Sequence, residues 1–231
     1  MSIAANLAEV RVRVERACLR AGRDPAGVTL VAVSKTHSAE AVREAYAAGQ
    51  RDFGENYAQE LAAKREALAD LPDIRWHFIG ALQSNKAKLV VPGAVLVHAV
   101  DRPSVAEALS RRAAAAGVAV NLLVEVNVGG EETKAGVAPD AVASLLDAIA
   151  ALPSVRVCGL MCIPPPTEVE SEARAAFGRL RTLAGALRPS HPGLDILSMG
   201  MSGDFEWAIA EGSTHVRVGT AVFGSRPARG S

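Results

Sequence analysis

Lys35 is the residue whose type and position point most directly to chemistry. The chain uses five lysines against 20 arginines, yet a lysine follows the apolar run VTLVAV at 28–33. An amine held among apolar groups has a lowered pKa, which frees its lone pair to form a Schiff base with a carbonyl. The alternative is a lysine that extends to solvent from the end of a strand.

Two glycine-bearing turns near the end of the chain, SMGMSGD at 198–204 and RVGT at 217–220, carry hydroxyl side chains. Glycines allow the backbone to approach a ligand closely, and Ser202 and Thr220 can donate hydrogen bonds beside Gly219. These features are typical of a phosphate site at the end of a barrel. The alternative for Ser202 is a cap on the helix expected over 204–211.

Arg217 lies between two valines in the last apolar run. A buried guanidinium needs an acceptor, and either a ring nitrogen or a carboxylate would serve. The alternative is a structural ion pair, for example with Glu125. A Schiff-base lysine, a phosphate site and a cation between them together indicate pyridoxal 5′-phosphate (PLP) as the cofactor.

Other polar residues carry weaker signals. Asn56 is a candidate polar contact at a strand end, and Lys134 is a cation in a loop. We interpret His77 and His98 as core histidines with satisfied hydrogen bonds, and no spacing in the chain resembles a metal site. The cysteines are interpreted as reduced core thiols; they are Cys18, Cys158 and Cys162.

Eight short apolar runs alternate with segments of helical period, which predicts a parallel α/β fold after a first helix at 3–21. The runs are 28–33, one ending near 53, 75–79, 95–100, 120–126, 155–161, 194–198 and 215–218. The expected helices are 39–48, 57–69, 85–90, 104–116, 140–152, 168–187 and 204–211. We predict one closed (β/α)8 TIM barrel over 1–231, because an open doubly wound sheet would usually carry a glycine-rich turn after its first strand.

Composition narrows the range of partners. The 231 residues carry 25 basic and 25 acidic side chains, which argues against nucleic acid and anionic membranes. Charges interrupt the first segment, MSIAANLAEVRVRVER, where a signal peptide would be apolar, so we expect a cytoplasmic protein. We also predict a monomer.

Several stretches resemble the YggS/PROSC family of pyridoxal phosphate homeostasis proteins, whose fold is that of the N-terminal barrel of alanine racemase. They are VAVSKTH, FGENYAQE, WHFIGALQSNK, VNVGGEETKAG, GLMCIPP, LSMGMSGDFEWAI and GSTHVRVGTAVFG. The resemblance implies that Lys35 binds PLP as an internal aldimine and that Arg217 approaches the pyridine nitrogen. It also implies phosphate contacts from Ser202, Gly219 and Thr220.

The resemblance implies a carrier without catalytic turnover, which holds PLP, passes it to apo-enzymes or salvage, and affects vitamin B6 and amino-acid pools. Racemases of this type have a second, β-rich domain that supplies a tyrosine base, for which we expect no room after Ser231. Neither Tyr46 nor Tyr57 is placed to replace that base. The alternatives are a PLP-dependent racemase or decarboxylase, and then a lysine-dependent aldolase without a cofactor.

Overall fold

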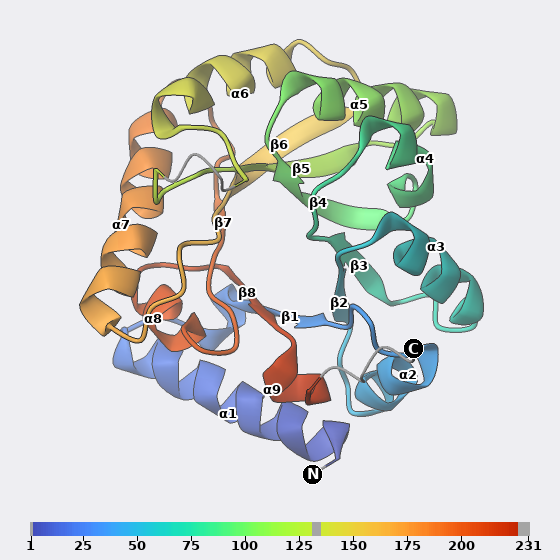
Figure 1. The fold of residues 1–231 in the computed structure, drawn as a ribbon, viewed down its shortest axis with the longest axis vertical. Coiled ribbons are helices and arrows are strands. Elements are labelled where there is room, and N and C mark those ends of the chain that lie inside the picture. Colours follow the sequence, from blue (N-terminus) through green and yellow to red (C-terminus); the bar gives the residue numbers. More distant parts are fainter. Residues whose placement is uncertain (1, 131–134, 226–231) are drawn as a thin grey trace.

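Eight parallel strands close into a barrel in the computed structural model, which describes residues 2–130 and 135–225 (Figure 1). The strands follow chain order around the barrel, and β8 pairs with β1 to close it. They are β1 (Thr29–Val33), β2 (Asp52–Glu55), β3 (Arg75–Phe78), β4 (Ala94–Val100), β5 (Val120–Glu125), β6 (Val155–Met161), β7 (Ile196–Ser198) and β8 (His215–Val218). The predicted (β/α)8 fold is confirmed.

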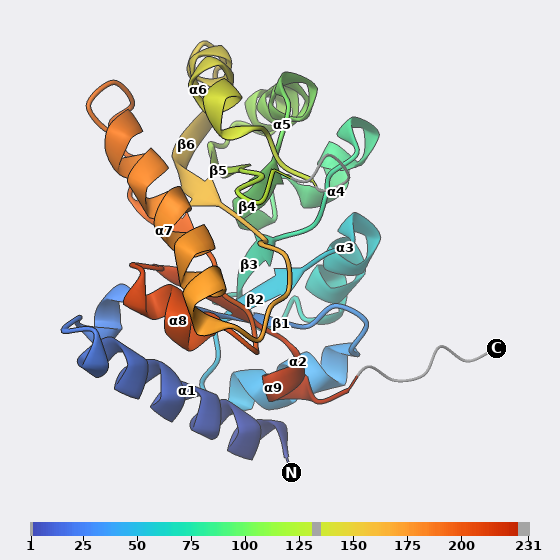
Figure 2. The ribbon, with the colours of Figure 1, turned by 60° about the vertical axis from the view of Figure 1, so that its left-hand side comes forward.

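Helices surround the barrel, and the predicted N-terminal helix α1 packs along α8 and α9 on its outside (Figure 2). The helices are α1 (Ile3–Arg20), α2 (Ala39–Ala47), α3 (Ala58–Ala67), α4 (Ala87–Val90), α5 (Pro103–Ala116), α6 (Val142–Ala150), α7 (Glu170–Leu187), α8 (Phe205–Ala210) and α9 (Thr220–Phe223). None of the helices in the described ranges combines the length and hydrophobicity needed to cross a membrane.

Local sequence signals explain where the helices begin and end. The Ser2 hydroxyl accepts a hydrogen bond from the Ala5 amide at the start of α1, and Ser38 does the same for Ala41 in α2. Helix α5 begins at Pro103 and is followed by Gly117 at φ 66°, a left-handed conformation that favours glycine.

Three helical segments differ from the sequence-based expectation. The helix expected over 85–90 is divided into a 3-10 turn at Ser84–Lys86 and the single turn of α4. The helix expected over 140–152 also begins with a 3-10 turn, at Pro139–Ala141. The short helix α9 was not expected, because only Gly219 separates it from β8.

Side chains alternate between the two faces of the closed sheet, as the period of a strand requires. On β5, Leu122 and Val124 belong to the large core between sheet and helices, whereas Leu123 belongs to a separate small cluster. Cys18 and Cys162 are buried, but Cys158 is half-buried. Cys158 nevertheless packs against the small cluster that contains Leu123, so all three thiols contact the core, as predicted.

Candidate functional site

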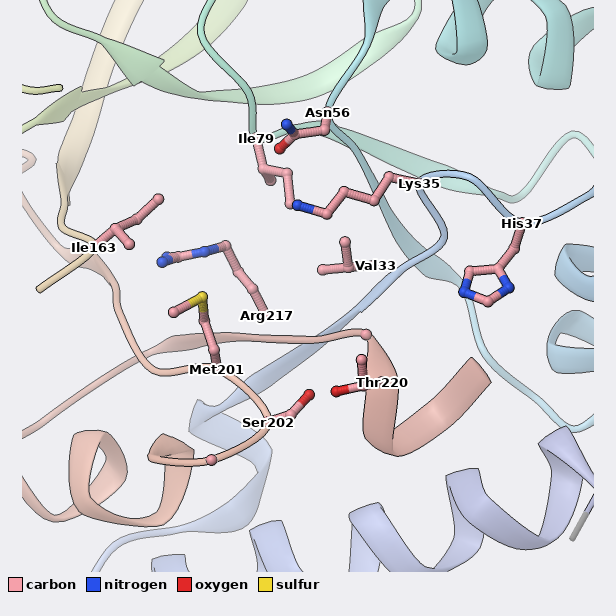
Figure 3. A pocket seen from close by; sticks show the side chains of 12 residues that line it. Val33, Lys35, His37, Asn56, Ile79, Ile163, Met201, Ser202, Arg217 and Thr220 are labelled. Carbon is pink, nitrogen blue, oxygen red and sulfur yellow. The ribbon is translucent and has the colours of Figure 1, made fainter. Parts of the chain in front are cut away.

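A cavity of about 270 Å³ opens where the carboxyl ends of the strands meet, and it contains all six residues predicted to bind the cofactor (Figure 3). The predicted residues are Lys35, Asn56, Ser202, Arg217, Gly219 and Thr220. The walls between them are largely apolar and include Val33, Ile79, Ile163 and Met201. The predicted Lys134 lies outside the described residues.

The backbone just after Lys35 is held in an uncommon conformation. Thr36 has φ 67°, a left-handed value that costs energy for a residue other than glycine. Its amide donates to both carboxylate oxygens of Glu60 on α3, at 3.1 Å each. Figure 3 shows the Lys35 side chain extended into the cavity. The Glu60 contact therefore fixes the direction in which the chain leaves β1 beside Lys35.

A buried ion pair supports the residue that precedes Lys35. The Lys64 ammonium donates to Glu55 Oε1 and to the Ser34 carbonyl oxygen, each at 2.7 Å. The Ser34 hydroxyl also donates to Glu55 Oε1, at 2.6 Å. Burial raises the pKa of Glu55 to about 7, against the attraction of Lys64, which lowers it. Both sides of Lys35 are thus tied to α3 and β2.

The second end of the cavity is formed by two hydroxyl groups that face one another, those of Ser202 and Thr220 (Figure 3). Gly200, at φ 92°, turns the chain before Ser202, and a Cβ atom there would lie 2.6 Å from the Ala208 Cβ. A Cβ atom at Gly219 would lie 3.3 Å from the Val33 carbonyl oxygen, so the glycine allows a close approach of β8 to β1.

The alternative role for Ser202 as a helix cap is wrong. Helix α8 follows Asp204, and the Asp204 carboxylate accepts a hydrogen bond from the Met201 amide at 2.6 Å. The Ser202 oxygen instead accepts from the Ala221 amide, at 3.5 Å. Asp204 therefore organises the turn, and the Ser202 side chain lies in the cavity.

Arg217 reaches the cavity from inside the barrel and is only 4% exposed. It donates to the Ser198 hydroxyl at 2.6 Å and to the Cys162 carbonyl oxygen at 3.0 Å. Burial lowers the pKa of its guanidinium, although Glu125 and Asp204 act in the opposite direction. Among the described residues no ion pair joins Arg217 to Glu125, so the alternative of a direct ion pair is wrong.

His77 and His98 are buried with satisfied hydrogen bonds, as predicted. His77 contacts the Asp52 carboxylate, and His98 contacts the Ser198 hydroxyl. Asn56 follows β2, and a Cβ atom at Gly80 would lie 2.1 Å from the Asn56 carbonyl oxygen. Gly80 is therefore the residue that lets the ends of β2 and β3 come together at the cavity.

Sequence reasoning missed the residues that hold the backbone on either side of Lys35. Glu55 and Glu60 lie in FGENYAQE, in which the sequence singles out only Asn56 as a site residue. Lys64 is one of only five lysines and is 6% exposed. The scarcity of lysine that drew attention to Lys35 was the available signal for Lys64 as well.

The fold and the cavity together define a class of protein. The chain forms a closed barrel of eight parallel strands, and the family model of the alanine racemase N-terminal domain matches residues 5–227. The alanine racemase of Corynebacterium glutamicum shares 18% identity at a TM-score of 0.67 over 96% of this chain and 62% of that chain. That likeness shows the fold alone.

Closer relatives narrow the class. A Pseudomonas aeruginosa protein named pyridoxal phosphate homeostasis protein is 52% identical over 97% of this chain and 96% of its own. An Aquifex aeolicus protein of the same name is 46% identical over 98% of this chain and 99% of its own. The structure of PipY from Synechococcus elongatus with PLP bound is 42% identical, with a TM-score of 0.84 over 96% of this chain and 100% of that one. The chain belongs to the pyridoxal phosphate homeostasis protein family, as its motifs predicted.

Proposed function

We propose that this protein binds PLP in the cavity as a Schiff base on Lys35 and releases it again, so that it buffers the intracellular supply of the cofactor. The observation that carries the proposal is the meeting of an amine, a guanidinium and two hydroxyl groups in one small, apolar-walled cavity. PLP supplies an aldehyde, which condenses with a lysine amine with loss of one water; hydrolysis reverses the reaction.

The chemistry of the lining fits the two ends of such a ligand. Ser202, Thr220 and the backbone at Gly219 would bind the phosphate, while Lys35 would hold the aldehyde carbon. Arg217 would donate to the pyridine nitrogen, because its guanidinium has donors and no acceptor. Asn56 would contact the polar edge of the ring. The name of the relatives and the PLP bound to PipY support this assignment.

We further propose a non-catalytic role. In this proposal residues 1–231 form a single PLP-binding domain that acts as a monomer in the cytoplasm, supplies apo-enzymes that depend on PLP and thereby affects amino-acid pools. The three free cysteines suit a reducing compartment. An arginine at the ring nitrogen also suits a carrier, because it leaves that nitrogen unprotonated and makes the ring a poorer electron sink.

A PLP titration followed by visible absorption tests the binding mode. Lys35→Met removes the amine while keeping a side chain of similar length, and we expect it to abolish the Schiff-base band. Lys88→Met, on the exposed face of α4, is the matched control and should titrate like the wild type. An unchanged band in Lys35→Met would contradict the proposal.

Turnover tests the non-catalytic role separately. The PLP-loaded protein is incubated in deuterium oxide with a panel of amino acids, and exchange at the α-carbon is followed by NMR. We expect no exchange above that of free PLP. Steady exchange on the order of 1 per second would identify an enzyme instead.

A further inference from the structure

A line of hydrogen-bonded side chains runs through the interior of the barrel and ends at Arg217. Arg217 contacts the Ser198 Oγ atom at 2.6 Å, and Ser198 Oγ contacts His98 Nδ1 at 2.8 Å. His98 Nε2 lies 3.0 Å from His77 Nδ1, and His77 Nε2 lies 3.0 Å from Asp52 Oδ1. We call Asp52, His77, His98 and Ser198 the barrel relay.

The relay is enclosed along its whole length. His98 and Ser198 have no exposed surface, and His77 is 3% exposed. Asp52 is the first residue of β2, so it lies at the amino end of the barrel, opposite the cavity. There the exposed Arg75 donates from Nε to Asp52 Oδ1 at 2.8 Å. The relay therefore joins an ion pair at one end of the barrel to a cavity residue at the other.

The chemistry of the two ends fixes one direction of donation through the relay. Arg217 can only donate, so Ser198 accepts from it and turns its own hydrogen toward His98 Nδ1. A neutral His98 then carries its hydrogen on Nε2 and donates to His77 Nδ1. His77 in turn carries its hydrogen on Nε2 and donates to the Asp52 carboxylate. An ionised carboxylate has no hydrogen to donate, so Asp52 acts only as an acceptor.

The ionised state of Asp52 and the neutral state of His98 agree with this direction. Burial raises the pKa of Asp52, but hydrogen bonds from His77 and Arg75 outweigh it and lower that pKa to about 2. Burial also lowers the pKa of His98 well below its usual value. Outside the relay, the ring of His215 lies 6.0 Å from that of His77, and burial lowers the pKa of His215 to about 4.

The opposite direction requires a charged His77 that donates from both nitrogens. His98 would then donate from Nδ1 to Ser198, and the Ser198 hydrogen would have no acceptor among the hydrogen bonds of the described residues. A second buried cation would also lie on the same relay as Arg217, where desolvation makes charge costly. Neutral histidines in one defined tautomer avoid both costs.

We propose that the barrel relay positions the Arg217 guanidinium for a ligand ring in the cavity and, through the carboxylate at its far end, polarises the hydrogen bonds that hold it. The identity of that ligand as PLP rests on the proposed function. The relay itself is a property of the protein without ligand. Its four members are positioning residues, since none of them lines the cavity.

The tautomers test the relay in the protein without PLP. Long-range ¹H–¹⁵N NMR spectra of histidine rings distinguish the two neutral tautomers from the charged ring. We expect His77 and His98 each to carry hydrogen on Nε2 alone at neutral pH. A charged His77, or a hydrogen on Nδ1 of either ring, would overturn the proposal whether or not PLP binds.

Three variants test the positioning role through PLP affinity, with the absorption maximum of the bound cofactor as a second readout. Ser198→Ala breaks the relay next to Arg217, and we expect PLP to bind about 3- to 10-fold more weakly, as for one lost hydrogen bond. Asp52→Asn keeps an acceptor but removes the charge, so its effect should have the same sign and be smaller. Ser110→Ala is the matched control, because Ser110 is 4% exposed and its hydroxyl donates outside the relay, to the Pro153 carbonyl oxygen at 2.6 Å.

The outcomes separate the relay from the proposed function. Equal PLP affinity and absorption maximum in Ser198→Ala and Ser110→Ala would overturn the positioning role while leaving PLP binding intact. A wild-type protein that fails to bind PLP would overturn the proposed function. If Ser198→Ala does not fold, Asp52→Asn and the wild-type tautomers still decide the matter.

Discussion

The interior of the barrel is apolar on one side and polar on the other. On one side, apolar side chains from β4, β5 and β6 form a cluster of their own: Leu96, Ala99, Leu123 and Met161. On the other side, strands β2, β3, β7 and β8 contribute carboxylate, imidazole, hydroxyl and guanidinium groups, joined by His98 from β4. The same closed sheet encloses both the apolar and the polar side chains. Closure of the barrel therefore does not require polar side chains throughout its interior.

The difference indicates what each side does. The apolar cluster stabilises the fold in the way typical of barrel interiors. The polar side costs desolvation energy that must be recovered through hydrogen bonds. Only the polar side reaches Arg217 through side-chain hydrogen bonds; the contact of Arg217 near β6 is with the backbone carbonyl oxygen of Cys162. We infer that the polar groups are there for the site, while the apolar cluster serves stability alone.

The largest expected effect comes from opening the apolar side. Leu123 is fully buried, and Leu123→Ala should lower the free energy of unfolding by about 2–5 kcal/mol through lost burial and a residual cavity. Denaturant unfolding measures that loss. PLP affinity of the folded variant should match that of the wild type. A large loss of PLP affinity would contradict the separation of the two sides.

Glu125 lies beyond Leu123 on β5 and provides a pH-dependent test. Burial, then the negative charge of Asp101, raises its pKa from 4.5 to about 7. The folded state therefore binds this proton more tightly, so Glu125 contributes stability below pH 4.5 that is lost as pH rises through 7. Glu125→Gln does not titrate. Between pH 4.5 and pH 8, its stability should gain about 3 kcal/mol relative to the wild type. If denaturant unfolding gives the same pH dependence of stability for Glu125→Gln and the wild type, the raised pKa of Glu125 is refuted.

A smaller effect, on binding rather than folding, is expected at the phosphate end of the cavity. Ser202→Ala removes one hydroxyl donor to a charged ligand and should weaken PLP binding by about 10- to 100-fold. Binding of pyridoxal, which lacks the phosphate, is the control and should not change. Equal losses for both ligands would show that Ser202 does not contact the phosphate.

The smallest effect is expected at the amino end of the apolar side. Cys158 is half-buried, and its thiol donates to the Asn121 side-chain oxygen at 3.4 Å. Cys158→Ser can keep that hydrogen bond, so the free energy of unfolding should change by less than about 1 kcal/mol. A loss comparable with that of Leu123→Ala would mean that this end is packed as tightly as the centre.

The sequence predicted most of the fold because strand and helix periods repeat along the chain. All eight apolar runs form strands, and all six predicted site residues line the cavity. The contacts that the sequence could not predict join residues that lie far apart in the chain. Ser198 and His98 are 100 positions apart in the chain, and their contact exists only because the barrel closes. Similarly, the support of Ser34 by Glu55 and Lys64 depends on how α3 packs, which no local pattern encodes.

The most direct test of the account is to identify the lysine that holds PLP. The purified wild-type protein is saturated with PLP, reduced with borohydride, digested and analysed by mass spectrometry. We predict a pyridoxyl group on Lys35, which is the only lysine among the described residues that lines the cavity. A protein modified at another lysine with Lys35 intact, or not modified at all, would contradict the account.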